Sequence, residues 1–251
     1  MSLDPCCLTG FSWTGQPTGH ITKLAKNTTY ITGTNLSTAI LLIHDLLSWE
    51  FPNTRLLADH YAREANATVY VPDFFAGERL PFEPIVKERF GDLDVKGFVA
   101  KNSREIREPE IVACARALRA QYRKVAAVGF CYGGWAVFRL GAKEHQPPLV
   151  DCISAGHPTF LTRRDVDEVA VPVQVLAPEH DTAFPAEMKS YTFEAMVRSG
   201  VPFDYQHFPG VAHACLTRGD PEKVGEREAM VRGKDAAVGW FRQFLWEQVD
   251  E

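Results

Sequence analysis

The sequence has no long apolar run, no excess of positive charge and no C-x-x-C pair. No apolar run approaches the ~18 residues that a membrane-spanning helix needs, so we expect no membrane partner. The net charge of −5 gives no electrostatic reason to expect nucleic acid as a partner. Without C-x-x-C spacing, nothing in the cysteine pattern suggests zinc.

The start of the chain also lacks the features of an export signal. Asp4 and Pro5 stand where a signal peptide would have a basic start and an apolar core. The six cysteines are scattered over 251 residues, and Cys6 and Cys7 are too close for an ordinary bridge. We therefore interpret the cysteines as thiols and predict a cytoplasmic protein, either a monomer or a homodimer.

What is present is the composition of one globular α/β domain, which we place at residues 1–251. Apolar residues make up 45% of the chain and charged residues 24%, as is typical of soluble proteins. Strand and helix patterns alternate along the chain, which predicts a mostly parallel sheet covered on both faces. The expected strands are 39–45, 67–75, 125–130, 150–156, 171–181 and 203–210, and the expected helices are 52–66, 109–124, 132–145, 185–200 and 221–249.

One segment interrupts this alternation. Residues 76–107 are rich in charge, glycine and aromatic side chains, and we expect them to form a lid or another excursion from the sheet.

The stretch "GFCYGG" places Cys131 where a strand should become a helix. A nucleophile on such a sharp elbow needs small residues two positions before and after it, and Gly129 and Gly133 meet that need. The start of the following helix would favour the thiolate. The alternative is a structural cysteine, buried beside an ordinary tight turn.

Two later residues could complete a catalytic group. Asp181 follows an expected strand and His213 lies in the loop after the last one, in the chain order nucleophile, acid, histidine. Asp181 alone could equally be a turn or helix-cap residue, and His213 alone a surface residue. Together with the elbow at Cys131, they predict a triad.

These motifs resemble the dienelactone hydrolase family of α/β-hydrolases. The family's elbow is similar to "GFCYGG", its acid to "PEHD" and its histidine to "PGVAH", while residues 53–77 resemble the corresponding segment of fungal members. The resemblance implies an α/β-hydrolase fold and a triad of Cys131, Asp181 and His213.

The resemblance implies further roles around this triad. Asp45 stands where the family has a glutamate that holds the resting thiol, and with its shorter side chain it would either reach the thiol or only shape the pocket. By analogy with the fold, the backbone N–H groups of Leu46 and Tyr132 would form the oxyanion hole. Arg218 lies five residues past His213, similar to a family arginine that binds a substrate carboxylate.

Four more residues are candidates for substrate contact. His157 follows an expected strand and could touch substrate, act as a rival base or simply occupy a turn before Pro158. Trp49, Phe75 and Trp135 could wall an apolar pocket, and core packing is the alternative for each.

We therefore predict a lactone or ester hydrolase that forms a thioacyl intermediate on a small-molecule substrate and needs no metal or organic cofactor. Thioesterase or C–C hydrolase activity on a secondary metabolite is an alternative. Two alternatives belong to other functional classes. One is a catalytically silent small-molecule binding protein of the same fold, and the other is a thiol-redox or amidotransferase-like protein. The intact Cys, Asp and His argue against the first, and the chain order and the missing second cysteine argue against the other.

Overall fold

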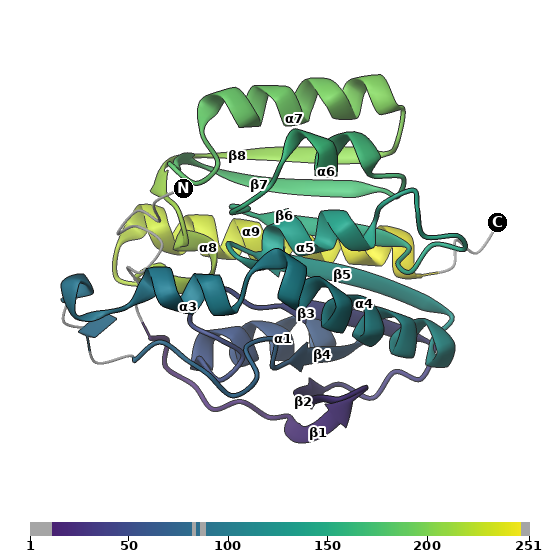
Figure 1. The fold of residues 1–251 in the computed structure, drawn as a ribbon, viewed down its shortest axis with the longest axis horizontal. Coiled ribbons are helices and arrows are strands. Elements are labelled where there is room, and N and C mark those ends of the chain that lie inside the picture. The colour runs from purple at the N-terminus through teal and green to yellow at the C-terminus, as the bar shows by residue number, and fades with distance from the viewer. Residues whose placement is uncertain (1–11, 82–83, 86–88, 247–251) are drawn as a thin grey trace.

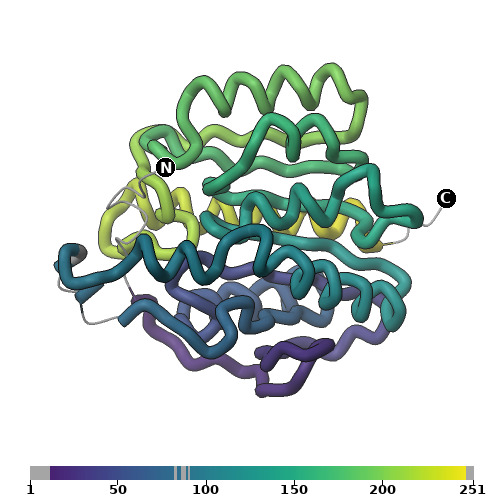
Figure 2. Tube along the Cα trace, in the orientation of Figure 1, coloured from purple at the N-terminus to yellow at the C-terminus, as the bar shows by residue number. Residues whose placement is uncertain are grey.

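The structure, a computed structural model, describes residues 12–81, 84–85 and 89–246. Within them, eight strands form one sheet in the order β1-β2-β4-β3-β5-β6-β7-β8. The strands are β1 (His20–Leu24), β2 (Asn27–Thr32), β3 (Thr38–Ile43), β4 (Thr68–Pro72), β5 (Lys124–Phe130), β6 (Cys152–Gly156), β7 (Val173–His180) and β8 (Phe203–Ala212). Figure 2 shows the sheet running from the purple β1–β2 hairpin at one edge to the green β8 at the other.

The prediction of a mostly parallel α/β sheet is confirmed. β1, β2 and β4 pair antiparallel, whereas the pairs from β4 through β3, β5, β6 and β7 to β8 are all parallel. Every residue of β3 is buried, as expected for a parallel strand covered on both faces. Leu41 and Ile43 enter one apolar core, while Ile40 and Leu42 enter the other, because successive side chains point to opposite faces.

Helices cover both faces of the sheet (Figure 1). Helices α4, α5, α6 and α7 contribute to the core on one face, and α1, α8 and α9 contribute to the core on the other. The helical segments are α1 (Pro52–Glu64), the 3₁₀ turn η2 (Phe90–Asp92), α3 (Val95–Lys101), α4 (Arg104–Gln121), α5 (Gly133–Leu140), α6 (Arg163–Glu168), α7 (Ala186–Ser199), α8 (Cys215–Arg218) and α9 (Val224–Leu245).

The predicted start of one helix is wrong. We expected it to begin at Pro109, but α4 begins at Arg104 after Ser103, so Pro109 lies inside the helix. An internal proline lacks the N–H that would bond to the carbonyl four residues earlier, which costs α4 one backbone bond close to its start. The segment 76–107 therefore contains η2, α3 and the beginning of α4.

Other differences are smaller. The sequence did not predict the β1–β2 hairpin or α6, and the strand expected over 67–75 ends at Pro72. Cys6, Cys7 and the end of the helix expected over 221–249 lie outside the described residues, while Cys114, Cys131, Cys152 and Cys215 are buried. In the part of the chain that the structure describes, no helix is both long enough and apolar enough to cross a membrane.

Candidate active site

The carboxyl ends of five parallel strands bring the candidate residues to one edge of the sheet. Asp45 lies just past β3, and Cys131, His157, Asp181 and His213 directly follow β5, β6, β7 and β8. All five residues are buried. In open sheets of this kind, this edge is the usual place for a ligand site.

The backbone of the elbow is held in an unusual conformation. Cys131 has a φ of +50° and is completely buried, which places a non-glycine residue in the left-handed region. A Cβ at Gly129 would lie 2.1 Å from the carbonyl oxygen of Gly133, and one at Gly133 would lie 2.2 Å from the carbonyl oxygen of Ile43. Both contacts are with backbone, so glycine is required on each side of Cys131 where the strand and helix approach.

His213 and Asp181 form a buried pair. His213 Nδ1 is 2.8 Å from Asp181 Oδ1, and neither side chain is exposed. The same carboxylate oxygen accepts hydrogen bonds from the backbone N–H groups of Ala183 and Phe184, which fix its orientation. His213 Nε2 bonds to no oxygen or nitrogen among the described residues, and His213 also interacts with the side chain of Cys131.

The surroundings of His213 favour its protonated form. Burial lowers the pKa of His213, but negative charge on Cys131 and the hydrogen bond with Asp181 outweigh burial and raise it to about 10. The imidazolium is thus stabilised when the thiol of Cys131 is ionised. Electrostatics of this kind would suit a thiolate–imidazolium pair.

Thr159 is a contact of Cys131 that the sequence analysis missed. Its hydroxyl Oγ1 lies 3.3 Å from Cys131 Sγ, and its backbone N–H donates to the Cys131 carbonyl at 2.8 Å. No motif marks this residue, because its position depends on β6 pairing beside β5. Only the strand order could have indicated it.

Asp45 is paired with Arg218. Asp45 Oδ2 lies 2.9 Å from Arg218 Nε, and both side chains are buried. Asp45 Oδ1 accepts a hydrogen bond from the backbone N–H of Leu47, and Thr217 Oγ1 lies 3.5 Å from Oδ2. The structure thus brings together two residues that the sequence analysis assigned to separate roles, one at the thiol and one at a substrate carboxylate.

His157 lies against the proposed base. Its ring centroid is 4.8 Å from that of His213, edge to face. Its backbone is left-handed, with a φ of +37°, and neither ring nitrogen has a hydrogen-bond partner among the described residues. Burial, together with His213 and Arg218, holds the pKa of His157 well below its usual value, so the ring is neutral at physiological pH.

The two oxyanion-hole candidates are also at this edge. Leu46 follows Asp45, and Tyr132 is the residue that precedes α5; both are buried. The phenol of Tyr132 donates to the carbonyl of Asn102 at 2.6 Å. This bond joins the residue after Cys131 to the end of α3.

The three aromatic candidates divide between the two cores. Phe75 and Trp135 belong to the core beneath α4 and α5, where both rings contact Tyr132 edge to face. Trp49 belongs to the core on the α1 face, where the guanidinium of Arg55 lies 4.7 Å from its ring. All three side chains are core residues in the described structure.

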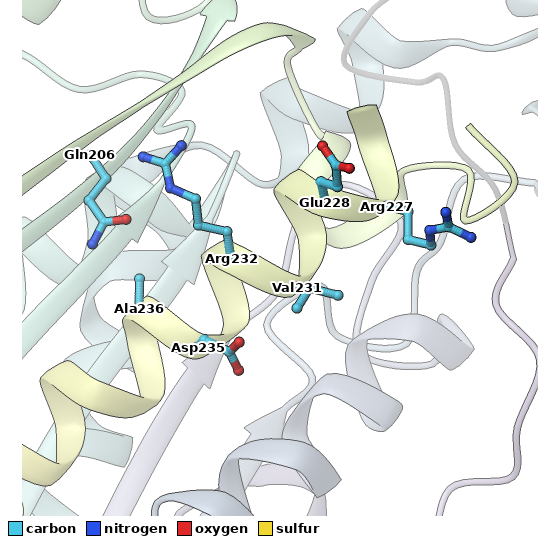
Figure 3. A pocket seen from close by; sticks show the side chains of 7 residues that line it. All are labelled: Gln206, Arg227, Glu228, Val231, Arg232, Asp235 and Ala236. Carbon is cyan, nitrogen blue, oxygen red and sulfur yellow. The ribbon is translucent and has the colours of Figure 1, made fainter. Parts of the chain in front are cut away.

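The groove in Figure 3 is a separate feature. It holds about 570 Å³ between β8 and α9 and is open to solvent. Gln206 faces it from β8, and Arg227, Glu228, Val231, Arg232, Asp235 and Ala236 line it from α9 (Figure 3). None of these residues belongs to the site at the carboxyl edge. Across residues 12–81, 84–85 and 89–246, no three His, Cys, Asp or Glu side chains gather to hold a metal ion.

The chain is similar to known hydrolases along most of its length. The model of the dienelactone hydrolase family matches residues 28–245. A protein named hydrolase tropI from Talaromyces stipitatus is 27% identical over 253 residues, covering 97% of this chain and 97% of its own. A carboxymethylenebutenolidase homolog from Mus musculus is 29% identical, covering 86% of each chain.

A solved structure agrees with the fold. The crystal structure of a dienelactone hydrolase from Anabaena variabilis superposes with a TM-score of 0.61 at 16% sequence identity, covering 92% of this chain and 99% of its own. At that identity the likeness concerns the arrangement of strands and helices.

Proposed function

This chain belongs to the dienelactone hydrolase family, and we propose that it cleaves a lactone or carboxylic ester through a thioacyl enzyme. Cys131 is assigned as the nucleophile, His213 as the base and Asp181 as the carboxylate that orients the base. The observation that carries this assignment is the buried 2.8 Å pair of His213 and Asp181 beside a cysteine on a left-handed elbow. The assigned reaction uses no metal ion or organic cofactor.

In the first half of the reaction, His213 Nε2 takes the proton of Cys131, and the thiolate attacks the substrate carbonyl. The backbone N–H groups of Leu46 and Tyr132 donate to the oxyanion of the tetrahedral intermediate. When this intermediate collapses, the C–O bond breaks, and His213 returns its proton to the departing oxygen. The acyl group is then attached to Cys131 as a thioester.

In the second half, His213 removes a proton from water as the water attacks the thioester. Collapse of the second intermediate releases the carboxylic acid, and the proton on His213 returns to the sulfur. Because a thiolate is itself a good leaving group, productive substrates need stable leaving groups, such as enolates, phenolates or strained lactone alkoxides. Lactones, enol esters and thioesters are favoured over amides.

The remaining assignments concern substrate binding. His157 is neutral because its pKa is lowered, which suits a hydrogen bond to substrate better than proton abstraction. Arg218 is a candidate partner for an acidic group of the substrate, with Asp45 as its partner at rest. Phe75 and Trp135 would form the apolar wall near the elbow. The cytoplasmic location and the choice between monomer and homodimer stay predictions of the sequence.

The test is to trap the acyl enzyme. The purified protein is mixed with p-nitrophenyl acetate, quenched within seconds and digested for mass spectrometry. We expect an acetyl group on Cys131 and steady release of p-nitrophenol, both of which are lost in Cys131→Ala. Cys152→Ala, which removes another fully buried thiol, should keep both. Acetylation and turnover that survive in Cys131→Ala would contradict the assignment.

The same experiment separates the alternative functions. A silent binding protein would bind an ester without releasing p-nitrophenol, and a redox protein would form a disulfide or mixed disulfide instead of a thioester. Comparing kcat/KM for matched oxygen esters and thioesters would show whether the protein acts mainly as an esterase or as a thioesterase. The geometry of His213 and Asp181 favours hydrolysis among these functions.

A further inference from the structure

The loop after β6 holds a residue that reaches the proposed nucleophile from outside the triad. We infer that Thr159 is a positioning residue that fixes the Cys131 sulfur and stabilises its thiolate. Thr159 Oγ1 lies 3.3 Å from Cys131 Sγ, and both residues are buried. This inference rests on the proposed role of Cys131 as the nucleophile.

The backbone places Thr159 independently of its hydroxyl. Phe130 pairs with Gly156 where β5 and β6 end, so the residues that follow the two strands are neighbours. The Cys131 N–H donates to the Gly156 carbonyl at 3.0 Å, and the Thr159 N–H donates to the Cys131 carbonyl at 2.8 Å. These two bonds tie the loop to the elbow, and a change confined to the Thr159 hydroxyl leaves both in place.

The elbow and the loop are also packed closely together. A Cβ at Gly134 would lie 2.4 Å from Pro158 Cβ, so the residue before Thr159 packs directly on the start of α5. His157 and Phe160, which flank Pro158 and Thr159, both have left-handed backbones, with φ of +37° and +59°. Strained non-glycine residues of this kind persist where the surrounding structure over-determines them, and they cluster at functional sites.

The hydroxyl can serve both protonation states of the sulfur. A threonine O–H rotates, so it can accept a hydrogen bond from the neutral thiol of Cys131 or donate one to the thiolate. A hydrogen bond to an ionised group is stronger than one between neutral groups. The Thr159 hydroxyl therefore favours the thiolate on balance and lowers the pH at which the thiol ionises.

Other groups around the sulfur also influence this ionisation. His213, paired with Asp181, faces Cys131 from the loop after β8 and favours the thiolate when protonated. His157, from the same loop as Thr159, is neutral because its pKa is lowered. Arg218, on α8, is paired with Asp45. A substitution at Thr159 leaves all five of these side chains unchanged, so its effect on the sulfur can be measured separately.

The experiment compares Thr159→Val with Thr159→Ser. Valine keeps the shape of threonine without the hydroxyl, whereas serine keeps the hydroxyl. The rate at which iodoacetamide alkylates Cys131 is measured from pH 5 to 10, with the labelled cysteine identified by mass spectrometry. The midpoint is the pH at which the alkylation rate reaches half of its maximum. We expect this midpoint to rise by about one pH unit in Thr159→Val and to stay within about 0.3 units of the wild type in Thr159→Ser.

Turnover provides the second measurement. At a pH below the midpoint, a rise of one unit leaves about one tenth of the thiolate, so kcat/KM for the aryl ester, which reports acylation of Cys131, should fall about tenfold in Thr159→Val. The kcat should change less, because hydrolysis of the acyl enzyme does not use the thiolate as nucleophile. If Thr159→Val does not fold, as judged by circular dichroism, Thr159→Ala serves as the variant without a hydroxyl.

The outcomes separate this inference from the proposed function. If the midpoint is unchanged in the variant that lacks the hydroxyl and Cys131 is still labelled first, the role of Thr159 is overturned. The assignment of Cys131 as nucleophile then stands. A shift in Thr159→Ser as large as that in Thr159→Val would overturn the role of Thr159 too, because the hydroxyl would not be the cause. Fast labelling of a different cysteine in the wild type, with activity lost in step, would overturn Cys131 as nucleophile and the role of Thr159 with it.

Discussion

Asp165, in α6, and Asp181, directly after β7, are both buried carboxylates, yet their hydrogen bonds are distributed differently. Asp165 is saturated: Arg104 donates to both of its oxygens at 2.7 and 2.8 Å, and the hydroxyl and N–H of Thr162 donate to Oδ2. Asp181 has its three hydrogen bonds on Oδ1, while Oδ2 has no partner among the described residues. The first carboxylate is held by a permanent cation, and the other by a histidine that can gain and lose a proton.

The backbone also differs between Thr162, which bonds to Asp165, and the residues next to His213, which bonds to Asp181. Thr162, the N-cap of α6, has an ordinary extended conformation and forms a capping box with Asp165. Ala214, which follows His213, has a φ of +72°, and Cys131 has a φ of +50°. Fully satisfied hydrogen bonds are expected of a carboxylate that stabilises the fold. An oxygen without a partner among the described residues is expected at a functional position, which is the role proposed for Asp181.

The largest expected difference is in turnover. Asp181→Asn replaces the acceptor of His213 Nδ1–H with an amide that can donate instead, which favours the wrong tautomer of the ring. We expect kcat for the aryl ester to fall by about 10³–10⁴-fold, while the thermal midpoint stays close to that of the wild type. Asp165→Asn should lower the thermal midpoint but leave kcat per folded molecule within about twofold.

Steady-state kinetics with active-site titration would measure both variants. The proposed contrast between the two carboxylates would be contradicted if Asp181→Asn retained more than about a tenth of the wild-type kcat. It would also be contradicted if Asp165→Asn lost as much kcat as Asp181→Asn is expected to lose. Either result would mean that the hydrogen bonding of these two buried carboxylates does not indicate their roles.

The second prediction concerns the close approach of β3 and α5 beside the elbow. Gly133→Ala places a Cβ 2.2 Å from the carbonyl oxygen of Ile43, and a backbone atom cannot move away cheaply. We expect the free energy of unfolding to fall by about 3 kcal/mol. Gly239→Ala, in α9, meets nothing within 4 Å and should raise the free energy of unfolding by about 0.5–1 kcal/mol.

Urea unfolding monitored by circular dichroism would give both values. Equal effects in the two variants would show that the elbow can relax. The close approach of β3 and α5 would then not be what requires glycine at position 133.

The sequence predicted those parts of the fold whose side chains form long apolar patterns. The strand over 125–130 and the helix over 185–200 agree with β5 and α7 to within one residue at each end. The hairpin of β1 and β2 was missed, because several of its side chains are exposed or half-exposed and show no strong apolar pattern. The helix start at Pro109 was wrong because prolines are common at helix starts, while α4 tolerates one in its second turn.

Local motifs and chain order were enough to predict which candidate residues lie at the carboxyl edge of the sheet. Cys131, Asp181 and His213 each follow a strand in the expected order, and such local signals are visible in the sequence. The pair of Asp45 and Arg218 could not be predicted, since the two residues are far apart in sequence and meet only because α8 packs near the end of β3. Thr159 likewise contacts Cys131 through the pairing of β5 and β6.

The smallest expected effect is the loss, at acidic pH, of the unfolding free energy that Asp165 contributes. Burial raises the pKa of Asp165, but the hydrogen bonds from Arg104 and Thr162 outweigh it and hold the pKa below its usual value of 3.8. Because the folded pKa lies below the unfolded one, this carboxylate stabilises the fold above about pH 4, and its contribution is lost as the pH falls through the folded pKa. Asp165→Asn should therefore cost about 2 kcal/mol of unfolding free energy at pH 6 and less at each lower pH.

Urea unfolding of the wild type and Asp165→Asn at pH 6, 4 and 3 would measure this trend. Asp167→Asn removes an exposed carboxylate from the same helix, and its smaller effect should vary little over this range. If the cost of Asp165→Asn stayed constant down to pH 3, the negative charge would not be what Asp165 contributes. The geometry of its capping box, which an asparagine can partly reproduce, would then explain its stabilising effect, and the contrast with Asp181 would rest on hydrogen bonding alone.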